Sequence, residues 1–334
     1  MIKSFLILNI LTSLVLSQNN SYWPYTLPSY SLWPSYSVFQ SLRSSISGSV
    51  IIKGDSNYSP HTWNTITNTP KPAVIVQPKN SNDIIVALKF AKEYNIRVSV
   101  QSTGHHQDHR NIQDNSILID MSTMNSLSYD SAKKTLTSGP GNTFATIQTY
   151  VASQTNKQYV SLGGADPSVG IYGWTVGGGH GALTRLYGLG VDALLSVDLI
   201  IANFTVITAS STQNQGLFRA LRGSGGGAYG IAISLTVQLF PDPGTVSTFY
   251  GSFPLTTTIS TMFANWMASA PNYASAYFIP NNYGTYGSSI VISAQCFSSS
   301  STCSSVLSTL QTGCTSSCSL SLNKYSSYYD FIIV

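Results

Sequence analysis

The chain has 334 residues, enough for two domains of ordinary size with a core each. Only 8% of the residues are charged, well under the usual quarter, and the net charge is +4. Because Lys and Arg form no cluster, the composition argues against a nucleic-acid-binding surface.

The first residues are typical of a secretory signal peptide. Lys3 precedes an apolar run from Phe5 to Leu16, and Ser17 is small enough to suit cleavage after it. Neither this run nor any later segment has the apolar length that is needed to cross a bilayer. The alternative is an ordinary N-terminal strand or helix. We expect a secreted protein, cut after a signal peptide at 1–17, with an N-terminal segment over 18–65. Residues 18–60 of this segment are rich in Ser, Tyr, Trp and Pro and are expected to be irregular.

A strand–helix–strand unit is predicted next. The proline-bounded run Pro70–Pro78 predicts a strand, and residues 80–83 offer N-cap side chains to an amphipathic helix that ends near Asn95. Ile96–Val100 predicts the second strand, and a glycine-containing turn at 103–106 opens directly from it.

Further elements follow in chain order. The patterns predict a strand at 117–119, a helix at 143–153 after a Gly-Pro-Gly turn, a β-hairpin at 194–209, a short helix at 216–222 and a strand at 231–240. A Pro-Asp-Pro-Gly turn at 241–244 then marks a domain boundary near 243. Strands and one helix follow this turn, and the helix is predicted at 256–270. The tail at 298–327 is rich in Ser and Thr and poorly periodic.

All the cysteines lie late in the chain, at Cys296, Cys303, Cys314 and Cys318. An even number in a secreted chain favours two disulfides, for which three pairings are possible. A zinc site is disfavoured because the spacings are not paired C-x-x-C and no histidine lies nearby. N-glycosylation sequons, which fit a secreted protein, occur at Asn19, Asn57 and Asn203.

Three stretches of the chain are rich in glycine: residues 100–110, 162–192 and 221–231. So many glycines are expected where the backbone passes very close to a ligand or to another part of the chain, and exposed backbone N–H groups in such turns bind phosphate. A dinucleotide is therefore the expected ligand. The Rossmann pattern G-x-G-x-x-G with a later acidic residue is absent, and so is the P-loop pattern.

Segments 69–106, 163–192 and 216–241 resemble, in the same order, the FAD-binding domain of vanillyl-alcohol-oxidase and berberine-bridge-enzyme-like flavoproteins. The resemblance implies an α+β fold, with a two-subdomain PCMH-type FAD-binding domain over 66–243 and part of an α+β substrate domain over 244–334. Members of the family continue past the point where this chain stops, so we expect it to be C-terminally truncated.

The resemblance also implies a covalent link to FAD. The family pattern R-S-G-G-H, whose His bonds to the flavin 8α carbon, is matched by Gln101, Ser102, Thr103, Gly104 and His105. His105 is thus the expected attachment residue, and the neighbouring His106 is the alternative.

A second link, from a Cys in the family pattern G-x-C-P-T-V-G, is not expected because Asp166 stands at the Cys position. A carboxylate there is a candidate catalytic base or a ligand for a substrate hydroxyl. The alternative is that Asp166 caps the following turn.

The cofactor-binding residues in the later segments are expected to be Gly164, Ala165, Asp166, Ser168, Val169, Gly170, Gly173, Trp174, Gly177, Gly178, His180, Gly181, Gly230 and Ile231. For Trp174 and His180, the alternatives are a core residue and a packed histidine at a helix start. The histidines of residues 105–109 suggest a metal cluster, but the flavin pattern already accounts for His105, so no metal site is expected.

The leading interpretation is a secreted FAD-dependent oxidase. An alcohol, amine or sugar would pass hydride to the flavin, and O₂ would reoxidise the flavin with release of hydrogen peroxide. The alternative is a non-catalytic or degenerate secreted flavin-binding protein. The expected partners are a small-molecule substrate and O₂, with no nucleic acid and no membrane span, and the sequence does not fix an oligomeric state.

Overall fold

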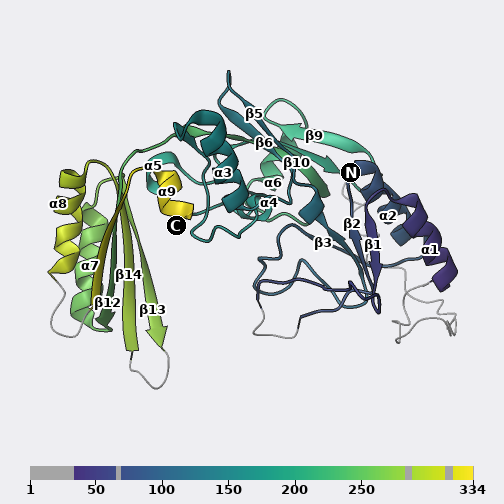
Figure 1. Ribbon diagram of the computed structural model, residues 1–334, viewed down its shortest axis with the longest axis horizontal. Helices are drawn as coiled ribbons and strands as arrows, with labels where there is room; N and C mark the ends of the chain where they lie inside the picture. Colours follow the sequence, from purple (N-terminus) through teal and green to yellow (C-terminus); the bar gives the residue numbers. More distant parts are fainter. Residues whose placement is uncertain (1–33, 65–68, 283–287, 313–318, 334) are drawn as a thin grey trace. The chain divides into compact units, whose positions relative to one another are not determined.

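The computed structural model describes residues 34–64, 69–282, 288–312 and 319–333 (Figure 1). The chain divides into two compact units, residues 1–123 and 124–334. The predicted signal peptide and the sequon at Asn19 lie outside the described residues. Within them, no helix combines the length and the apolar character that crossing a membrane requires. The domain limits expected from the sequence, including the boundary near 243, stay a prediction.

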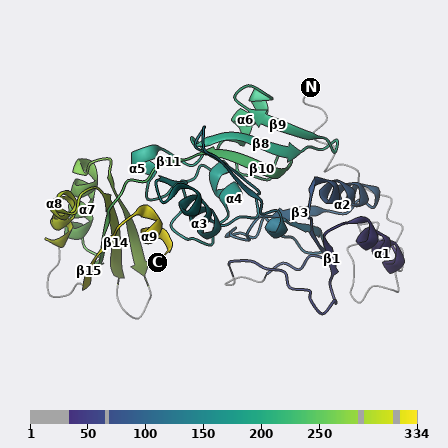
Figure 2. The ribbon, with the colours of Figure 1, turned by 45° about the horizontal axis from the view of Figure 1, so that its top comes forward.

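The N-terminal unit contains a four-stranded sheet (Figure 2). The strand order is β1 (Ser49–Ile52), β2 (Val74–Gln77), β4 (Ile117–Asp120) and β3 (Val98–Gln101). The pair β1/β2 is antiparallel, whereas β2/β4 and β3/β4 are parallel. Helices α1 (Tyr36–Ser45) and α2 (Ser81–Glu93) bury apolar side chains in one cluster with the sheet, and a 3-10 turn, η1 (Met121–Thr123), follows β4. The predicted strand–helix–strand unit is confirmed.

Helix α2 starts where the sequence predicts. The side chain of Asn80 caps it by accepting a hydrogen bond of 3.1 Å from the Asp83 N–H. The Asp83 carboxylate is fully buried and accepts hydrogen bonds from the backbone N–H groups of Ser47, Gly48 and Lys79 at 2.9 to 3.0 Å. One carboxylate thus joins the start of α2 to the chain that enters β1.

The expectation of an irregular stretch up to residue 60 is wrong, because α1 and β1 lie inside it. Phe39 and Leu42 of α1, at helical spacing, are both buried, and Val50, Ile51 and Ile52 of β1 are buried as well. The apolar residues of α1 are separated by serines, which are only moderate helix formers, so the sequence signal is weak. Packing against the sheet supplies the stability that local preference lacks.

The C-terminal unit contains a five-stranded antiparallel sheet in the order β5 (Leu127–Asp130), β6 (Thr135–Ser138), β10 (Ile231–Gln238), β8 (Leu194–Ile200) and β9 (Val206–Ser210). Side chains of α3 (Phe144–Thr155), α4 (Ile171–Val176) and α6 (Gln215–Leu221) share one apolar cluster with it. The predicted hairpin, both helices at 143–153 and 216–222 and the strand at 231–240 are confirmed, with ends shifted by one or two residues.

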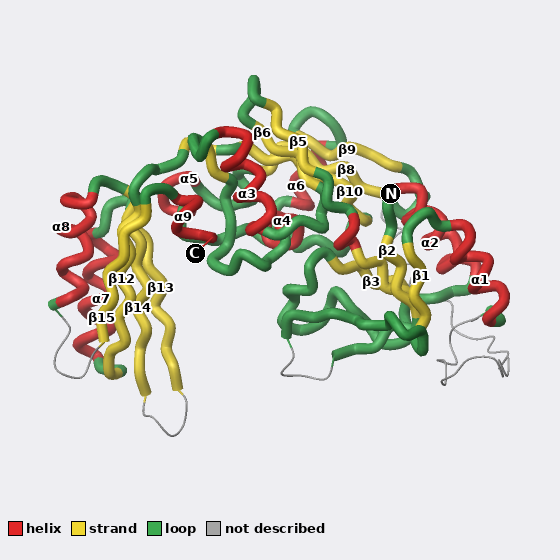
Figure 3. Tube along the Cα trace, in the orientation of Figure 1, coloured by secondary structure: helices red, strands yellow, loops and turns green. Residues whose placement is uncertain are grey.

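A second sheet of this unit has the order β13 (Ala274–Asn282), β14 (Ser288–Phe297), β12 (Val246–Pro254) and β15 (Ser319–Tyr325). Helices α7 (Thr257–Ser269) and α8 (Ser300–Gln311) cover one of its faces (Figure 3). The smaller elements are β7 (Tyr159–Val160), α5 (Thr184–Tyr187), β11 (Phe240–Pro241) and α9 (Tyr328–Ile333). The predicted helix at 256–270 is confirmed, while α8 and β15 lie in the tail that reads as poorly periodic.

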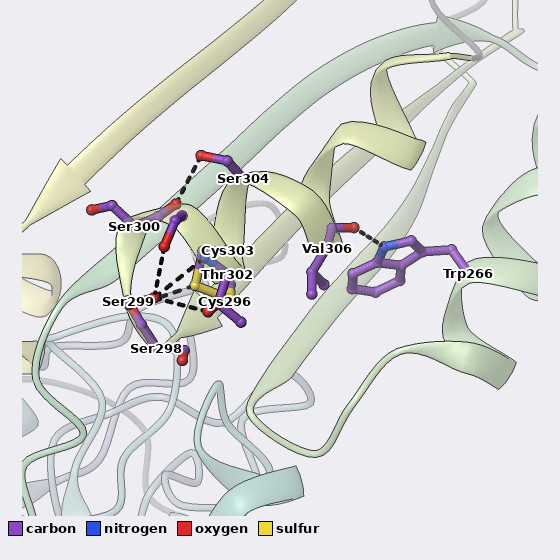
Figure 4. Close-up of a disulfide and its surroundings, with 10 residues drawn as sticks. Trp266, Cys296, Ser298, Ser299, Ser300, Thr302, Cys303, Ser304 and Val306 are labelled. Atoms are coloured by element: carbon purple, nitrogen blue, oxygen red, sulfur yellow. Dashed lines mark hydrogen bonds between the residues drawn. A yellow bond between two sulfur atoms is a disulfide. The ribbon is translucent and has the colours of Figure 1, made fainter.

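One disulfide joins Cys296 of β14 to Cys303 of α8 (Figure 4). Beside it, Trp266 of α7 donates a hydrogen bond of 2.9 Å from its indole N–H to the Val306 carbonyl of α8. Of the three pairings that the sequence leaves open, this bond selects the one that joins Cys296 to Cys303. The other two cysteines lie outside the described residues.

Candidate functional site

The loop after β3 carries the first set of predicted site residues. Gln101 is buried, and its Oε1 accepts a hydrogen bond of 3.0 Å from Asn111 Nδ2. Gly104 is buried with φ at +84°, a conformation that favours glycine, and Ser102 and Thr103 are half-buried. Across the described chain, the backbone N–H groups of Thr103 and Gly104 meet no acceptor. Two such donors on a glycine turn suit an anion such as phosphate.

Residues 61–64 lie along this loop and fix its path. The Trp63 N–H donates to the Gly104 carbonyl at 3.1 Å, and Asn64 Nδ2 donates to the Gln107 carbonyl at 2.8 Å. Nε2 of the buried His109 donates a hydrogen bond of 2.8 Å to the Asn64 carbonyl. We call residues 61–64 the strap. The sequence gives no sign of it, because its contacts depend on residues some 40 positions later.

The three histidines of the loop have different surroundings. The His105 ring stacks on the Trp63 indole, with centroids 5.1 Å apart and planes at 26°. His106 Nδ1 accepts a hydrogen bond of 3.1 Å from the Asp108 N–H, so the neutral ring carries its proton on Nε2. No group of three His, Cys, Asp or Glu side chains is placed to hold a metal ion anywhere in the described residues.

The second set of predicted residues begins with the turn at 164–170, which is joined to the start of α3. The N–H of Phe144 donates to the Val169 carbonyl at 3.0 Å, and a β-bridge joins Thr143 to Gly170. Asp166 Oδ1 accepts hydrogen bonds from the Ser168 N–H at 2.8 Å and the Ser168 hydroxyl at 2.6 Å. This geometry favours the turn-capping role of Asp166, and its catalytic role stays a prediction.

Trp174 of α4 is packed among glycines. Its indole N–H donates to the His180 carbonyl at 3.2 Å, and its ring meets Phe144 edge-on with centroids 4.9 Å apart. An added Cβ would come within 3.0 Å of the indole at Gly164, Gly179 and Gly190. At Gly181 it would lie 1.9 Å from the Gly163 carbonyl oxygen. The packing of this unit therefore accounts for these glycines without a ligand.

Two other glycines of the region have no such explanation. An added Cβ at Gly173 of α4 or at Gly227 would meet no atom within 4 Å, and neither residue has a positive φ. Glycine inside a helix is less stable than alanine by about 0.5–1 kcal/mol, so Gly173 carries a cost that the described protein does not require. A ligand that lies directly on the backbone would require it.

The third glycine-rich stretch folds onto the end of α4. The N–H groups of Gly223 and Gly225 donate to the Val176 carbonyl at 2.9 and 3.1 Å. Tyr172 donates its hydroxyl to the Gly226 carbonyl at 3.3 Å, and burial raises the pKa of Tyr172 to about 12, so it stays a donor near neutral pH. The stretches at 162–192 and 221–231, separate in sequence, therefore form one glycine-lined surface on this unit.

The remaining predicted residues lie around this surface. Gly177 and Gly178 close α4 through hydrogen bonds to Gly173 and Thr175 carbonyls, while Ala165 is exposed. An added Cβ at Gly230 would lie 2.5 Å from the Ile200 carbonyl oxygen, so strand packing explains this glycine. Ile231, the first residue of β10, is buried.

A residue that sequence reasoning missed lies next to the exposed His180. The His180 ring meets the Tyr277 ring of β13 edge-on, with centroids 5.6 Å apart. Burial raises the pKa of Tyr277, which keeps the phenol neutral and able to donate a hydrogen bond. No pattern near residue 277 reveals which loop its strand lies against, so only the fold finds it.

Comparisons with known proteins show similarity to FAD-linked oxidoreductases. The family described as an FAD binding domain matches residues 72–210. The FAD-linked oxidoreductase YvdP of Bacillus subtilis is 32% identical over 72% of this chain and 52% of its own length. Berberine bridge enzyme-like 21 of Arabidopsis thaliana is 31% identical over 55% of this chain and 34% of its own length.

Among solved structures, BBE-like 1 of Physcomitrella patens superposes with a TM-score of 0.77 at 22% identity, over 86% of this chain and 62% of that chain. This likeness supports the predicted α+β fold. The chain spans about half the length, or less, of the curated relatives that it matches.

The residues present fit FAD. The loop after β3 offers two backbone donors without an acceptor, as a pyrophosphate needs, and the second unit offers bare backbone at Gly173 and Gly227. These features come from different units, and each is a property of its own unit.

Gly173→Ala tests whether a ligand lies on α4. We expect the free energy of unfolding of this variant to be about 0.5–1 kcal/mol higher than that of wild type, because alanine stabilises a helix relative to glycine and the added methyl group meets no neighbour. Its affinity for FAD should fall about 10- to 100-fold, because the methyl group occupies the place of the ligand. Chemical denaturation and FAD titration measure the two effects.

The matched control is Gly216→Ala, because Gly216 also lies in a helix with nothing within 4 Å of an added Cβ but is not a predicted cofactor residue. It should gain stability and keep its FAD affinity. Equal FAD affinities for the two variants would show that no cofactor contacts Gly173.

Proposed function

We propose that this chain, which matches an FAD binding domain family over residues 72–210 and is similar to FAD-linked oxidoreductases and berberine bridge enzyme-like proteins, takes part in FAD-dependent oxidation of a small molecule. The observation that carries the proposal is the turn at Thr103 and Gly104, whose backbone N–H groups meet no acceptor among the described residues; the bare backbone at Gly173 is a separate, supporting feature of the other unit. When bound, the flavin takes a hydride from an alcohol, amine or sugar carbon and passes the electrons to O₂, which gives hydrogen peroxide.

The residues of this chain bind and orient the cofactor. The N–H groups of Thr103 and Gly104 would donate to the pyrophosphate, and the bare backbone at Gly173 and Gly227, in the other unit, would leave room for a bound cofactor. The Trp174 indole is held in one orientation by its hydrogen bond to the His180 carbonyl and by its contact with Phe144, so a ligand beside α4 would meet a fixed aromatic surface. Tyr277, neutral at physiological pH, is a hydrogen-bond donor for the substrate.

We further propose that His105 carries a covalent bond to the flavin 8α carbon, and that His106 does not. Bond formation needs an imidazole nitrogen with an available lone pair. In neutral His106, Nδ1 uses its lone pair on the Asp108 N–H and Nε2 carries the proton. His109 is buried and its Nε2 donates to the strap. The surroundings of His106 and His109 therefore disfavour these two rings, and the match of Gln101–His105 to the family pattern supports His105.

We propose that the protein is secreted and glycosylated. The apolar run at 5–16, the disulfide between Cys296 and Cys303 and the exposed sequons at Asn57 and Asn203 support this. Protein from the medium of a eukaryotic host should migrate faster in electrophoresis after removal of N-linked glycans. Unchanged mobility would contradict glycosylation.

His105→Ala tests the covalent link. Wild-type protein precipitated with acid should retain flavin absorbance in the pellet, since a carbon–nitrogen bond survives denaturation. The His105→Ala variant should release all of its flavin to the supernatant, while His106→Ala should behave as wild type. Flavin that stays in the His105→Ala pellet and is lost from the His106→Ala pellet would reverse the assignment.

A wild-type protein whose bound FAD is not reduced by any alcohol, amine or sugar would favour the alternative of a non-catalytic flavin-binding protein.

A further inference from the structure

The strap at residues 61–64 does more than cover the loop after β3. Two of its hydrogen bonds run through the backbone and side chain of Asn64, and a third through the Trp63 N–H. None of the three uses the indole of Trp63. The strap is thus held in place by polar contacts, which leave the Trp63 side chain available for another role.

The indole of Trp63 is 49% exposed, which is unusual for so large an apolar group. Core packing therefore does not explain its position. Its ring partner is the His105 imidazole, stacked at 5.1 Å and 26°. We propose that Trp63 is a positioning residue that sets the His105 imidazole for bond formation with the flavin 8α carbon. This inference rests on the proposed covalent flavin site.

Two physical effects of the stack favour the bond. First, the indole face restricts rotation of the imidazole, so less freedom is lost when the ring reaches the attacking geometry. Second, positive charge develops on the imidazole as one of its nitrogens is alkylated, and an aromatic face attracts a cation that lies above it. Both effects act on the rate of attachment and leave reversible FAD binding unchanged.

The atoms and electrons of the bond-forming reaction balance with O₂ as the only additional reagent. One imidazole N–H bond and one C–H bond of the flavin 8α methyl group break, and one N–C bond forms. The two protons and two electrons that are released reduce the same flavin to its dihydro form. Dioxygen then reoxidises that flavin and leaves as hydrogen peroxide. The His105 nitrogen supplies the electron pair of the new bond, and Trp63 exchanges neither protons nor electrons.

The test follows covalent attachment over time after FAD is added in air to flavin-free full-length protein. Acid-precipitable flavin measures attachment, and total bound flavin measures reversible binding. We expect Trp63→Leu, which keeps apolar bulk but loses the aromatic face, to attach flavin about tenfold more slowly than wild type, at unchanged total binding. Trp63→Phe, which restores an aromatic face, should stay within about threefold of wild type.

Two controls separate positioning from stability. Tyr250→Leu removes another half-exposed aromatic ring, on β12 of the other unit, and should attach flavin at the wild-type rate. Trp63→Met keeps an apolar side chain of similar length and replaces the leucine variant if that one does not fold. Thermal unfolding of each variant identifies any loss of folded protein.

Attachment by the leucine or methionine variant at the wild-type rate would overturn the proposal. Wild-type protein that binds FAD only reversibly would overturn both this inference and the covalent link, while FAD binding itself would stand. Wild-type protein that binds no flavin would overturn the proposed function as a whole.

Discussion

The proposed binding of FAD depends on exposed backbone at glycines and on backbone N–H groups that have no hydrogen-bond acceptor within the described protein. The N–H groups of Thr103 and Gly104 meet no acceptor among the described residues, although Gly104 is buried. A buried donor without an acceptor costs about 1–3 kcal/mol. A pyrophosphate that accepts both bonds would remove that cost, so ligand binding and loop stability are linked.

Glycines in this chain fall into two physically different groups. Gly181, Gly190 and Gly230 are required by atoms of the protein itself, because a Cβ there would lie 1.9 to 2.5 Å from a neighbour. Gly173 and Gly227 face open space and have ordinary backbone angles, so the protein alone would tolerate alanine. This distinction separates the glycines that the packing of the protein itself requires from those, Gly173 and Gly227, at which we propose that a ligand lies. Trp174 shows the first case, since its indole takes up the space that Gly164, Gly179 and Gly190 leave.

The local signals predict much of the fold and less of the site. The Asn80 cap of α2, the hairpin β8/β9 and the helix α3 follow from patterns within a dozen residues, and the structure confirms them. The helix α1 is missed because its serines weaken the periodic signal, and β15 because it lies in a Ser/Thr-rich tail. Trp63 and Tyr277 are missed for another reason. Each contacts a ring about 40 or 100 positions away in the sequence, and only the fold shows which ring that is.

The proposed function requires that this chain binds one FAD. The most direct measurement is the flavin-to-protein ratio of the chain secreted by a eukaryotic host, taken from its visible absorbance spectrum. We expect a yellow protein with a ratio near one. A colourless protein that stays colourless when FAD is supplied would contradict it.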